Sequence, residues 1–305
     1  MIPLYLITGF LGAGKTTFLK ELITLFRNKR LALIINEFGK ESIDGVFFKD
    51  KGAALSEISN GSIFCSCKLD QFEQVLKNIA QKKPDVIIIE ASGLSNPQNV
   101  HRILGQPDFS TLDYKGSICL VDALNFHKVL YTALACKQQL SVADMIIINK
   151  TDLVTQESLN QTKALLGEIR PGIPVYTTSY GRIEKEWILY LKSGKDNNDK
   201  PLRQVADITL QKFLLDVTSV CSMELLREFI SLIAKDTYRI KGFVNKGGQN
   251  WFVDCVGENI KITPYHGTAD KLNRLVVLSG SGLPTRKSII SAIEKLNLSE
   301  DVLLK

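Results

Sequence analysis

The sequence predicts an α/β fold with a doubly wound parallel sheet, followed by a smaller C-terminal α+β domain. Through residue 190, short apolar runs typical of fully buried strands alternate with amphipathic segments typical of helices. That alternation indicates a parallel sheet with helices on both faces. A polar segment rich in Gly, Asn, Asp and Lys then interrupts the pattern, and strand-like runs follow it. We therefore expect a first domain at residues 1–192, a linker at 193–207 and a second domain at 208–305.

The composition limits the classes of protein to which the chain can belong. Of its 305 residues, 45% are hydrophobic and 23% are charged, which is typical of a globular protein and not of a disordered one. No apolar run reaches the roughly 18 residues that a membrane span needs, and we expect neither a signal peptide nor a membrane partner. The six cysteines are scattered, mostly in strand-like runs, which favours the reducing cytoplasm over a disulfide framework.

The net charge of +6 gives no sign of a nucleic-acid partner. The lysines are spread along the chain, and no basic stripe is interleaved with aromatic residues. A solvated surface explains the charge equally well, so we expect no binding of nucleic acid.

A glycine-rich turn lies between the first predicted strand, residues 4–7, and the first predicted helix, which continues from Phe18. Residues 9–16 fit the spacing G-x-x-x-x-G-K-T of a phosphate-binding loop. In such a loop the glycines let successive N–H groups converge on a phosphate, Lys15 reaches the β- and γ-phosphates, and the Thr16 hydroxyl ligates Mg²⁺. An ordinary glycine-rich turn is the alternative, and the strand-to-helix context disfavours it. The residues expected to bind nucleotide here are Gly9, Leu11, Gly12, Ala13, Gly14, Lys15, Thr16 and Thr17.

Two further predicted strands lead to an acidic residue at the edge of the sheet where a phosphate-binding loop would lie. The strand at 30–35 leads to Glu37, a candidate for the Mg²⁺ shell or for orienting water, or else a capping or surface acid. The strand at 85–89 ends in Glu90, and in phosphate-loop proteins an acid at this point holds Mg²⁺ directly or through water. Three residues on, Gly93 could present its backbone N–H to the γ-phosphate. The catalytic candidates are therefore Lys15, Glu37, Glu90 and Gly93.

The remaining segments of the first domain continue the alternation. Asn60-Gly61 predicts a turn, and from Leu69 apolar residues recur at helical spacing until Pro84 ends the helix. Strands at 116–121 and 143–148 follow.

The strand at 143–148 runs directly into residues 149–152, which fit the guanine-reading tetrad N-K-x-D. The Asp152 carboxylate can accept hydrogen bonds from the ring N–H and the exocyclic amine of guanine, and adenine offers no matching pair of donors. A strand and loop at 174–180 could close over the base. Four residues alone are a weak signal, and their place at the end of an apolar strand, after a phosphate-binding loop, makes the match specific. We expect a P-loop NTPase whose base contacts come from Asn149, Lys150, Asp152, Leu153 and Ser179.

Strand-like and helical segments of the second domain indicate an α+β arrangement. They are a strand at 212–217, a helix at 222–234, a hairpin of 238–245 with 249–256, a strand at 274–279 and a helix at 286–296. This part of the sequence shows no catalytic constellation. We interpret His266 as a surface or packing residue.

Taken together, these motifs resemble those of the CobW-like (cobalamin synthesis protein W) GTPases, a group of phosphate-loop proteins that includes metallochaperones. The resemblance implies binding of GTP, slow Mg²⁺-dependent hydrolysis to GDP and phosphate, and delivery of a metal to a client metalloprotein or maturation of that client. It covers nearly the whole chain. It rests on residues 8–17, 36–39, 60–61, 90–93, 121–123 and 149–152, and residues 239–243 are similar to the start of the family's second-domain hairpin.

The chain departs from the family at its metal motif. The family usually carries Cys-x-Cys-Cys directly after Asn-Gly, whereas here the three cysteine positions hold Ser62, Phe64 and Cys65, with a further thiol at Cys67. Lys40 stands where the family commonly has a glutamate, and its charge would repel a divalent ion. Cys65 and Cys67 could still hold Zn²⁺ or Co²⁺ if other ligands completed the site. The alternatives are a redox role, or one reactive and one packing cysteine without metal.

We therefore predict a cytoplasmic GTPase that couples its nucleotide state to a partner protein. The sequence supplies no obvious arginine finger, so intrinsic turnover should be slow, and a partner, a metal or a homo-oligomer would be needed to speed it. One alternative is a nucleotide-dependent regulatory or binding module that has lost metal binding. Another is a kinase acting on a small molecule, which the guanine tetrad disfavours.

Overall fold

The computed structural model describes residues 1–37, 54–59, 69–95, 97, 100–192, 210–218, 222–267 and 272–305. Its contacts divide the chain into two compact units, Met1–Leu130 with Leu134–Val205, and Tyr131–Ala133 with Ala206–Lys305. Within these described ranges, no helix is both long and apolar enough to cross a bilayer. The expected boundaries at residues 192 and 208 stay a prediction.

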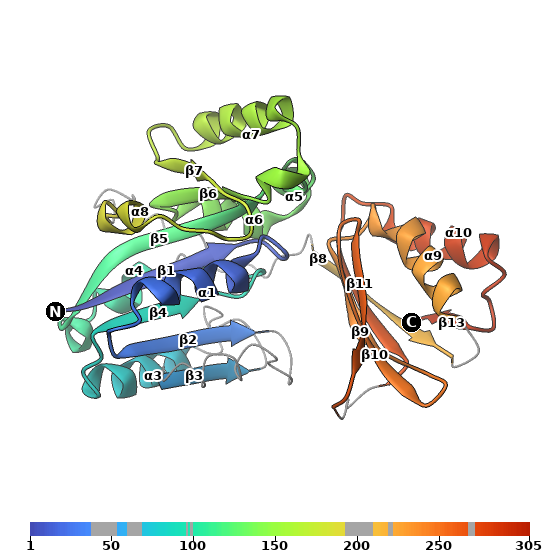
Figure 1. Cartoon of the computed structure of the whole chain (residues 1–305), viewed down its shortest axis with the longest axis horizontal. Helices are drawn as coiled ribbons and strands as arrows, with labels where there is room; N and C mark the ends of the chain where they lie inside the picture. Colours follow the sequence, from blue (N-terminus) through green and yellow to red (C-terminus); the bar gives the residue numbers. More distant parts are fainter. Residues whose placement is uncertain are drawn as a thin grey trace. The chain divides into compact units, whose positions relative to one another are not determined.

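The first unit is built on a parallel sheet whose described strands number seven, in the order β3-β2-β4-β1-β5-β6-β7 (Figure 1). All neighbouring strands in it run parallel. The strands are β1 (Ile2–Gly9), β2 (Leu31–Glu37), β3 (Ala54–Ser59), β4 (Val86–Glu90), β5 (Leu112–Asp122), β6 (Met145–Asn149) and β7 (Val175–Thr177). The helices are α1 (Lys15–Leu25), α3 (Leu69–Gln81), α4 (Val100–Leu104), α5 (Phe126–Thr132), α6 (Leu134–Ser141), α7 (Gln156–Ile169) and α8 (Lys185–Leu189).

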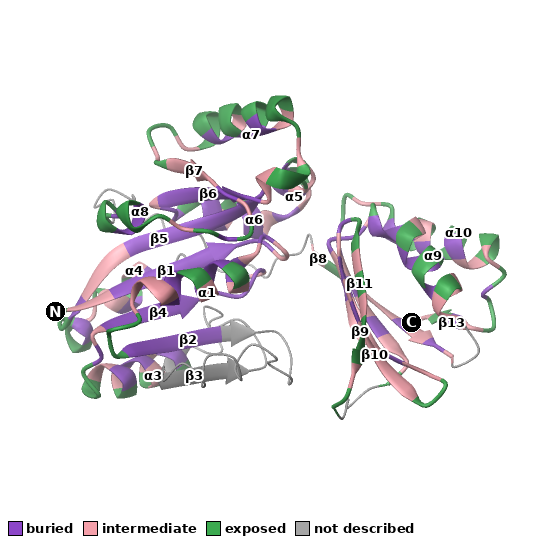
Figure 2. Cartoon of the chain, in the orientation of Figure 1, coloured by how far each residue is buried: buried purple, intermediate pink, exposed green. Residues whose placement is uncertain are grey.

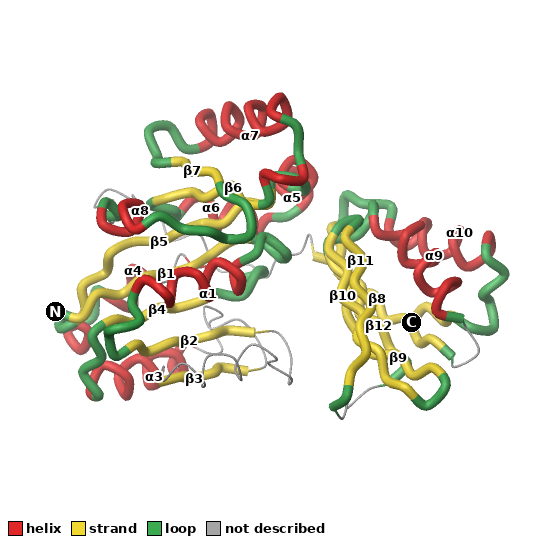
Figure 3. The backbone as a smooth tube through the Cα atoms, viewed as in Figure 1, coloured by secondary structure: helices red, strands yellow, loops and turns green. Residues whose placement is uncertain are grey.

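Helices cover both faces of this sheet (Figure 3). Tyr5 and Ile7 of β1 belong to a core that includes apolar side chains of α1 and α8. Leu4 and Leu6 belong to a second core, which includes side chains of α3 and α4. Because both faces of the central strands are buried (Figure 2), these strands read as unbroken apolar runs. The predicted doubly wound α/β fold is confirmed.

The strand order brings several chemically important strand ends to one edge of the sheet. Ile7 lies opposite Glu90 in the β1–β4 pair, and Asp122 lies opposite Asn149 in the β5–β6 pair. The loops that leave β1, β4, β5 and β6 therefore start side by side. In open α/β sheets this carboxyl edge is where ligands bind.

The second unit contains an antiparallel sheet of six described strands, in the order β11-β10-β9-β12-β8-β13. The strands are β8 (Leu210–Val217), β9 (Arg239–Lys246), β10 (Gln249–Val256), β11 (Asn259–Tyr265), β12 (Arg274–Gly280) and β13 (Val302–Leu304). Helices α9 (Met223–Ala234) and α10 (Thr285–Lys295) pack on the face that carries Ile240, Val253 and Val277. The predicted α+β class and the β9–β10 hairpin are confirmed, while β11 and β13 were not predicted.

Candidate nucleotide-binding site

The loop between β1 and α1 requires glycine at three positions. Gly12 and Gly14 have φ values of +77° and +93°, in the left-handed region that L residues rarely adopt. A Cβ at Gly9 would lie 2.4 Å from the Leu120 carbonyl oxygen, and one at Gly14 would lie 2.3 Å from Asn149 Nδ2. The loop is closed by a hydrogen bond from Ala13 N to the Phe10 carbonyl at 3.2 Å. This conformation directs the chain tightly into the amino end of α1.

Lys15 is the first residue of α1, and its ammonium group lies over the loop. Nζ donates to the Gly9 carbonyl at 2.8 Å and to the Phe10 carbonyl at 3.2 Å, and the residue is only 9% exposed. A buried cation beside a helix amino terminus makes this position favourable for an anion.

The Thr16 hydroxyl and the Glu90 carboxylate come together across the α1 and β4 ends. Thr16 Oγ1 donates to Glu90 Oε1 at 3.5 Å, and Glu90 is 7% exposed. Hydroxyl and carboxylate oxygens are the hard ligands that Mg²⁺ prefers, so this donor set fits that ion. The next residue, Thr17, is exposed on the helix.

Gly93, in the loop after β4, packs directly on the phosphate-binding loop. A Cβ at this position would lie 2.7 Å from both the backbone N and the Cδ2 of Leu11. Any side chain at residue 93 would therefore push the two loops apart. The structure places Gly93 against Leu11 of the phosphate-binding loop, and its contact with the γ-phosphate stays a prediction.

Asn149, at the end of β6, holds two loops together from a buried position. Its Nδ2 donates to the Ala13 carbonyl at 3.0 Å, and its Oδ1 accepts from Gly181 N at 3.1 Å. The sequence predicted Asn149 as a base-reading residue. Both of these hydrogen bonds are with protein backbone, so Asn149 links the phosphate-binding loop to the loop after β7.

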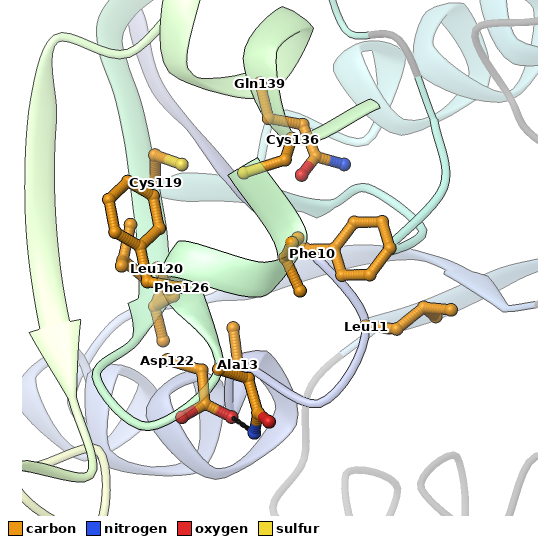
Figure 4. Close-up of a pocket in the computed structure, with 12 residues that line it drawn as sticks. Phe10, Leu11, Ala13, Cys119, Leu120, Asp122, Phe126, Cys136 and Gln139 are labelled. Carbon is orange, nitrogen blue, oxygen red and sulfur yellow. Dashed lines mark hydrogen bonds between the residues drawn. The ribbon is translucent and has the colours of Figure 1, made fainter. Parts of the chain in front are cut away.

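Lys150 is also held within the protein. It has a left-handed φ of +64°, and its Nζ pairs with Asp122 Oδ2 at 2.7 Å. Asp122 is 7% exposed and also accepts from Asn125 Nδ2 at 2.9 Å (dashed line in Figure 4). These contacts fix the path of the chain into the segment that carries Asp152.

Ser179 joins the loop after β7 to the tetrad. Its Oγ accepts from Asp152 N at 3.2 Å and lies 2.9 Å from Thr151 Oγ1. Asp152 and Leu153 are exposed, Leu153 by 48%. The polar side chain of Asp152 and the apolar side chain of Leu153 are therefore accessible at this end of the site.

Several predicted residues lie outside what the structure describes. Glu37 ends β2, and its side chain is among those not described. Lys40, Cys65 and Cys67 also lie outside the described residues. In the part of the chain that is described, no three His, Cys, Asp or Glu side chains are placed to hold a metal ion together.

A pocket next to the phosphate-binding loop brings residues of that loop together with buried residues that the sequence did not single out (Figure 4). Its lining includes Phe10 and Leu11 of the loop, Cys119 of β5, and Cys136 and Gln139 of α6. Burial raises the pKa of Cys119 to about 11 and the pKa of Cys136 further still. Both groups therefore stay neutral thiols near pH 7, which makes them poor nucleophiles and poor metal ligands.

Two residues that shape the site escaped the sequence analysis. Gly181 has a φ of +69°, and a Cβ on it would lie 2.7 Å from Phe18 N. The sequence signal that could have identified this tight turn was a glycine directly after Ser179 and Tyr180. Gln139 is fully buried and contacts the loop after β4, and no sequence signal distinguishes it from the adjacent Gln138.

A doubly wound parallel sheet, whose first strand leads through a glycine-rich loop into a helix, is the architecture of P-loop nucleotide-binding proteins. Residues 3–177 match the family described as the CobW/HypB/UreG nucleotide-binding domain. The chain belongs to this family, and the resemblance seen in its sequence is confirmed.

Curated relatives are similar over part of the chain. The Escherichia coli zinc chaperone YeiR is 36% identical over 156 residues, which cover 50% of this chain and 48% of the relative. The Sinorhizobium zinc chaperone CobW is 33% identical over 192 residues, covering 53% and 54% respectively. The chain thus spans about half the length of these relatives. The solved structure of the Zn(II)-bound YjiA GTPase from E. coli has a TM-score of 0.46 and 21% identity, covering 97% of this chain and 98% of that chain.

Proposed function

We propose that this protein binds GTP with Mg²⁺ and slowly hydrolyses it to GDP and phosphate. The observation that carries the proposal is the Asn149 side chain, which joins the phosphate-binding loop at Ala13 to the loop after β7 at Gly181. One residue of an N-K-x-D tetrad thereby links the place for phosphates with the place for a base. Membership of a nucleotide-binding family supports the same function.

Each residue of the site has a role that follows from its position. Lys15 and the loop amides balance the charge of the phosphates, and Gly93 offers its N–H to the γ-phosphate. Thr16 and Glu90 would hold Mg²⁺, with Glu37 as a further candidate. When bound, that ion would supply positive charge that offsets the negative charge of the phosphates. Hydrolysis is expected to be slow because the sequence offers no obvious arginine finger to add charge in the transition state.

Guanine selection rests on Asp152. Its carboxylate can accept from the ring N–H and the exocyclic amine of guanine, and Ser179 holds its backbone in place. In Asp152→Asn the side chain presents an amide N–H, which suits the C2 carbonyl of xanthine instead. We expect the affinity for GTP to fall at least about tenfold, because hydrogen bonds to a charged group are lost, and the affinity for xanthosine triphosphate to rise.

The experiment is a calorimetric titration of wild type and Asp152→Asn with GTP, ATP and xanthosine triphosphate in the presence of Mg²⁺. Glu157→Gln, an exposed acid in the first turn of α7, is the matched control and should behave as wild type. Equal affinities for GTP and ATP in the wild type would contradict guanine selection and revive the small-molecule kinase.

We further propose that the nucleotide state is coupled to metal delivery or to maturation of a client metalloprotein in the cytoplasm. The zinc-chaperone names of the relatives support this role. Cys65 and Cys67 are the candidate ligands for Zn²⁺, and their number is short of the four that Zn²⁺ prefers. The alternative is a nucleotide-dependent regulatory module in which these thiols bind no metal.

A further inference from the structure

Gln139 of α6 reaches across to the loop that leaves β4. The residue is fully buried, and its Nε2 donates to the Gly93 carbonyl at 3.2 Å and to the Ser95 carbonyl at 3.2 Å. Both partners are carbonyl oxygens, so the amide nitrogen must face them. One side chain thus holds two points of the loop that carries the candidate γ-phosphate contact.

The oxygen of the same amide lowers the stability of the fold. Gln139 Oε1 is buried, and it has no hydrogen-bond partner among the described residues. It lies in the mainly apolar pocket with Phe10, Leu11 and Cys136 (Figure 4). A buried acceptor without a partner lowers stability, and an apolar side chain of similar size would avoid this cost. The apolar side chain would, however, leave the Gly93 and Ser95 carbonyls without their donor, so the two hydrogen bonds offset part of this cost.

The loop after β4 is fixed from two sides. Gly93 lies so close to Leu11 that a Cβ would be 2.7 Å from its backbone N, and its carbonyl is bound by Gln139. With the carbonyl held and the Cα against the phosphate-binding loop, the peptide planes around Gly93 have little freedom. A loop ordered in advance loses less conformational entropy when it binds its ligand.

We propose that Gln139 is a positioning residue that orders the Gly93 loop for the γ-phosphate and thereby lets the protein distinguish GTP from GDP. The inference rests on the proposed function, in which Gly93 meets the γ-phosphate. GDP has no γ-phosphate, so its binding does not depend on this loop. Removing the Gln139 contacts should therefore weaken the binding of GTP and leave the binding of GDP unchanged.

The test is Gln139→Met, which keeps the length of the side chain and removes both donors. With Mg²⁺ present, the dissociation constant for a non-hydrolysable GTP analogue should rise about five- to tenfold, the loss expected for hydrogen bonds of ordinary strength. The constant for GDP should stay within about twofold of wild type. Gln139→Leu repeats the measurement with a different apolar shape, so that a local misfit of one side chain does not decide the result.

Gln138→Met is the matched control, because the neighbouring glutamine is only half-buried and the two side-chain hydrogen bonds to the loop come from Gln139. It should change neither constant. Thermal unfolding of each variant reports the cost to the fold. Gln139→Met should unfold at a somewhat lower temperature than the wild type, because the Gly93 and Ser95 carbonyls lose their donor while the unpartnered Oε1 is also removed. The positioning effect is read from the ratio of the two dissociation constants.

The two proposals fail in different ways. If the wild type binds neither nucleotide, the proposed function is wrong and the inference is wrong with it. If the wild type binds both, and Gln139→Met either leaves the ratio of the two constants unchanged or weakens both equally, the inference alone is overturned.

Discussion

Asn149 Nδ2 donates a hydrogen bond to the carbonyl of Ala13, which precedes it by 136 residues, at 3.0 Å. The Asn149 amide also fills the space that a Cβ on Gly14 would need. The tip of the phosphate-binding loop is thus packed against the start of the N-K-x-D tetrad, residues 149–152. Binding of the phosphates and of the base are therefore expected to depend on one another.

Asn149→Ala should weaken both functions at once. The change leaves the Ala13 carbonyl and the Gly181 N–H without their partner, which should lower the free energy of unfolding by about 1 to 3 kcal/mol. GTP and GDP should lose affinity to a similar degree, since both place a base and two phosphates in the site. Denaturant unfolding and calorimetric titration measure these effects. Asn160→Ala, on the exposed face of α7, is the control and should shift stability by less than about 0.5 kcal/mol.

Gly93→Ala tests the close approach of two loops. The added Cβ would lie 2.7 Å from Leu11 N, so one of the two backbones must move, at a cost of about 1 to 3 kcal/mol. Hydrolysis of GTP should fall about tenfold or more, because the N–H offered to the γ-phosphate is displaced. The readout is phosphate release under multiple turnover, together with denaturant unfolding.

Gly167→Ala is the opposite case and serves as the control for Gly93→Ala. Gly167 is exposed on α7, and an added Cβ would meet no atom within 4 Å. The unfolded chain has less conformational freedom with alanine than with glycine at this position, so it loses less entropy on forming the helix. The free energy of unfolding should therefore rise by about 0.5 to 1 kcal/mol, and the rate of GTP hydrolysis should not change. Equal effects of the two substitutions would rule out a specific role for Gly93.

The parts of the site that the sequence predicted are those in which chemistry depends on short spacing. The glycines of the phosphate-binding loop, Lys15 and Thr16 were found because one strand, one turn and one helix follow each other directly. Gly181 and Gln139 were missed because their partners lie 32 to 46 residues away. Only the strand order of the folded sheet brings such residues together, and a single Gly or Gln carries no periodic pattern.

The same dependence on short sequence spacing explains which strands of the second unit the sequence predicted and which it missed. The hairpin of β9 and β10 was predicted because Lys246-Gly247-Gly248 marks a tight turn between two strand-like runs. Among the described strands, β11 pairs with β10 alone, and it contains Pro264, a residue that weakens a strand signal. Strand β13 has only three residues and pairs with β8, far earlier in the chain. Its existence depends on the packing of the whole sheet.

An ion pair joins the starts of two adjacent strands, and it should make the free energy of unfolding depend on pH in the acid range. Arg30, before β2, bonds Asp85, before β4, through its guanidinium at 2.9 Å and through its backbone N at 2.8 Å. The hydrogen bonds from Arg30 lower the pKa of Asp85 to about 2. Because the folded pKa lies below the unfolded value of about 4, the stabilisation is fully present above about pH 4 and is lost as the pH falls toward 2.

The measurement compares the melting temperatures of wild type and Asp85→Asn at neutral pH and near pH 2.5. The difference between them should be larger at neutral pH and shrink in acid. Glu157→Gln gives the baseline for removing an exposed acid. A difference that does not change with pH would show that the pair contributes no pH-dependent stability.

Cys65 and Cys67 provide the test that separates a metallochaperone from a nucleotide switch without metal. The described cysteines Cys119, Cys136 and Cys255 are buried. Burial raises the pKa of Cys119 to about 11 and keeps its sulfur protonated, whereas a metal ligand must be a thiolate. Metal that binds through thiols should therefore depend on the other cysteines of the chain.

We expect about one Zn²⁺ per chain after dialysis against the ion, with an amount that changes when a non-hydrolysable GTP analogue is present. The Cys65→Ser/Cys67→Ser double variant should lose this metal. Cys255→Ser should keep it, since a serine hydroxyl can replace the hydrogen bond from Cys255 Sγ to the Gly257 carbonyl. Parallel dialysis against Co²⁺, Ni²⁺ and Fe²⁺ reports selectivity. If wild type retains no more metal than the double variant, delivery of metal through these thiols is excluded, and the protein acts as a GTP-dependent module alone.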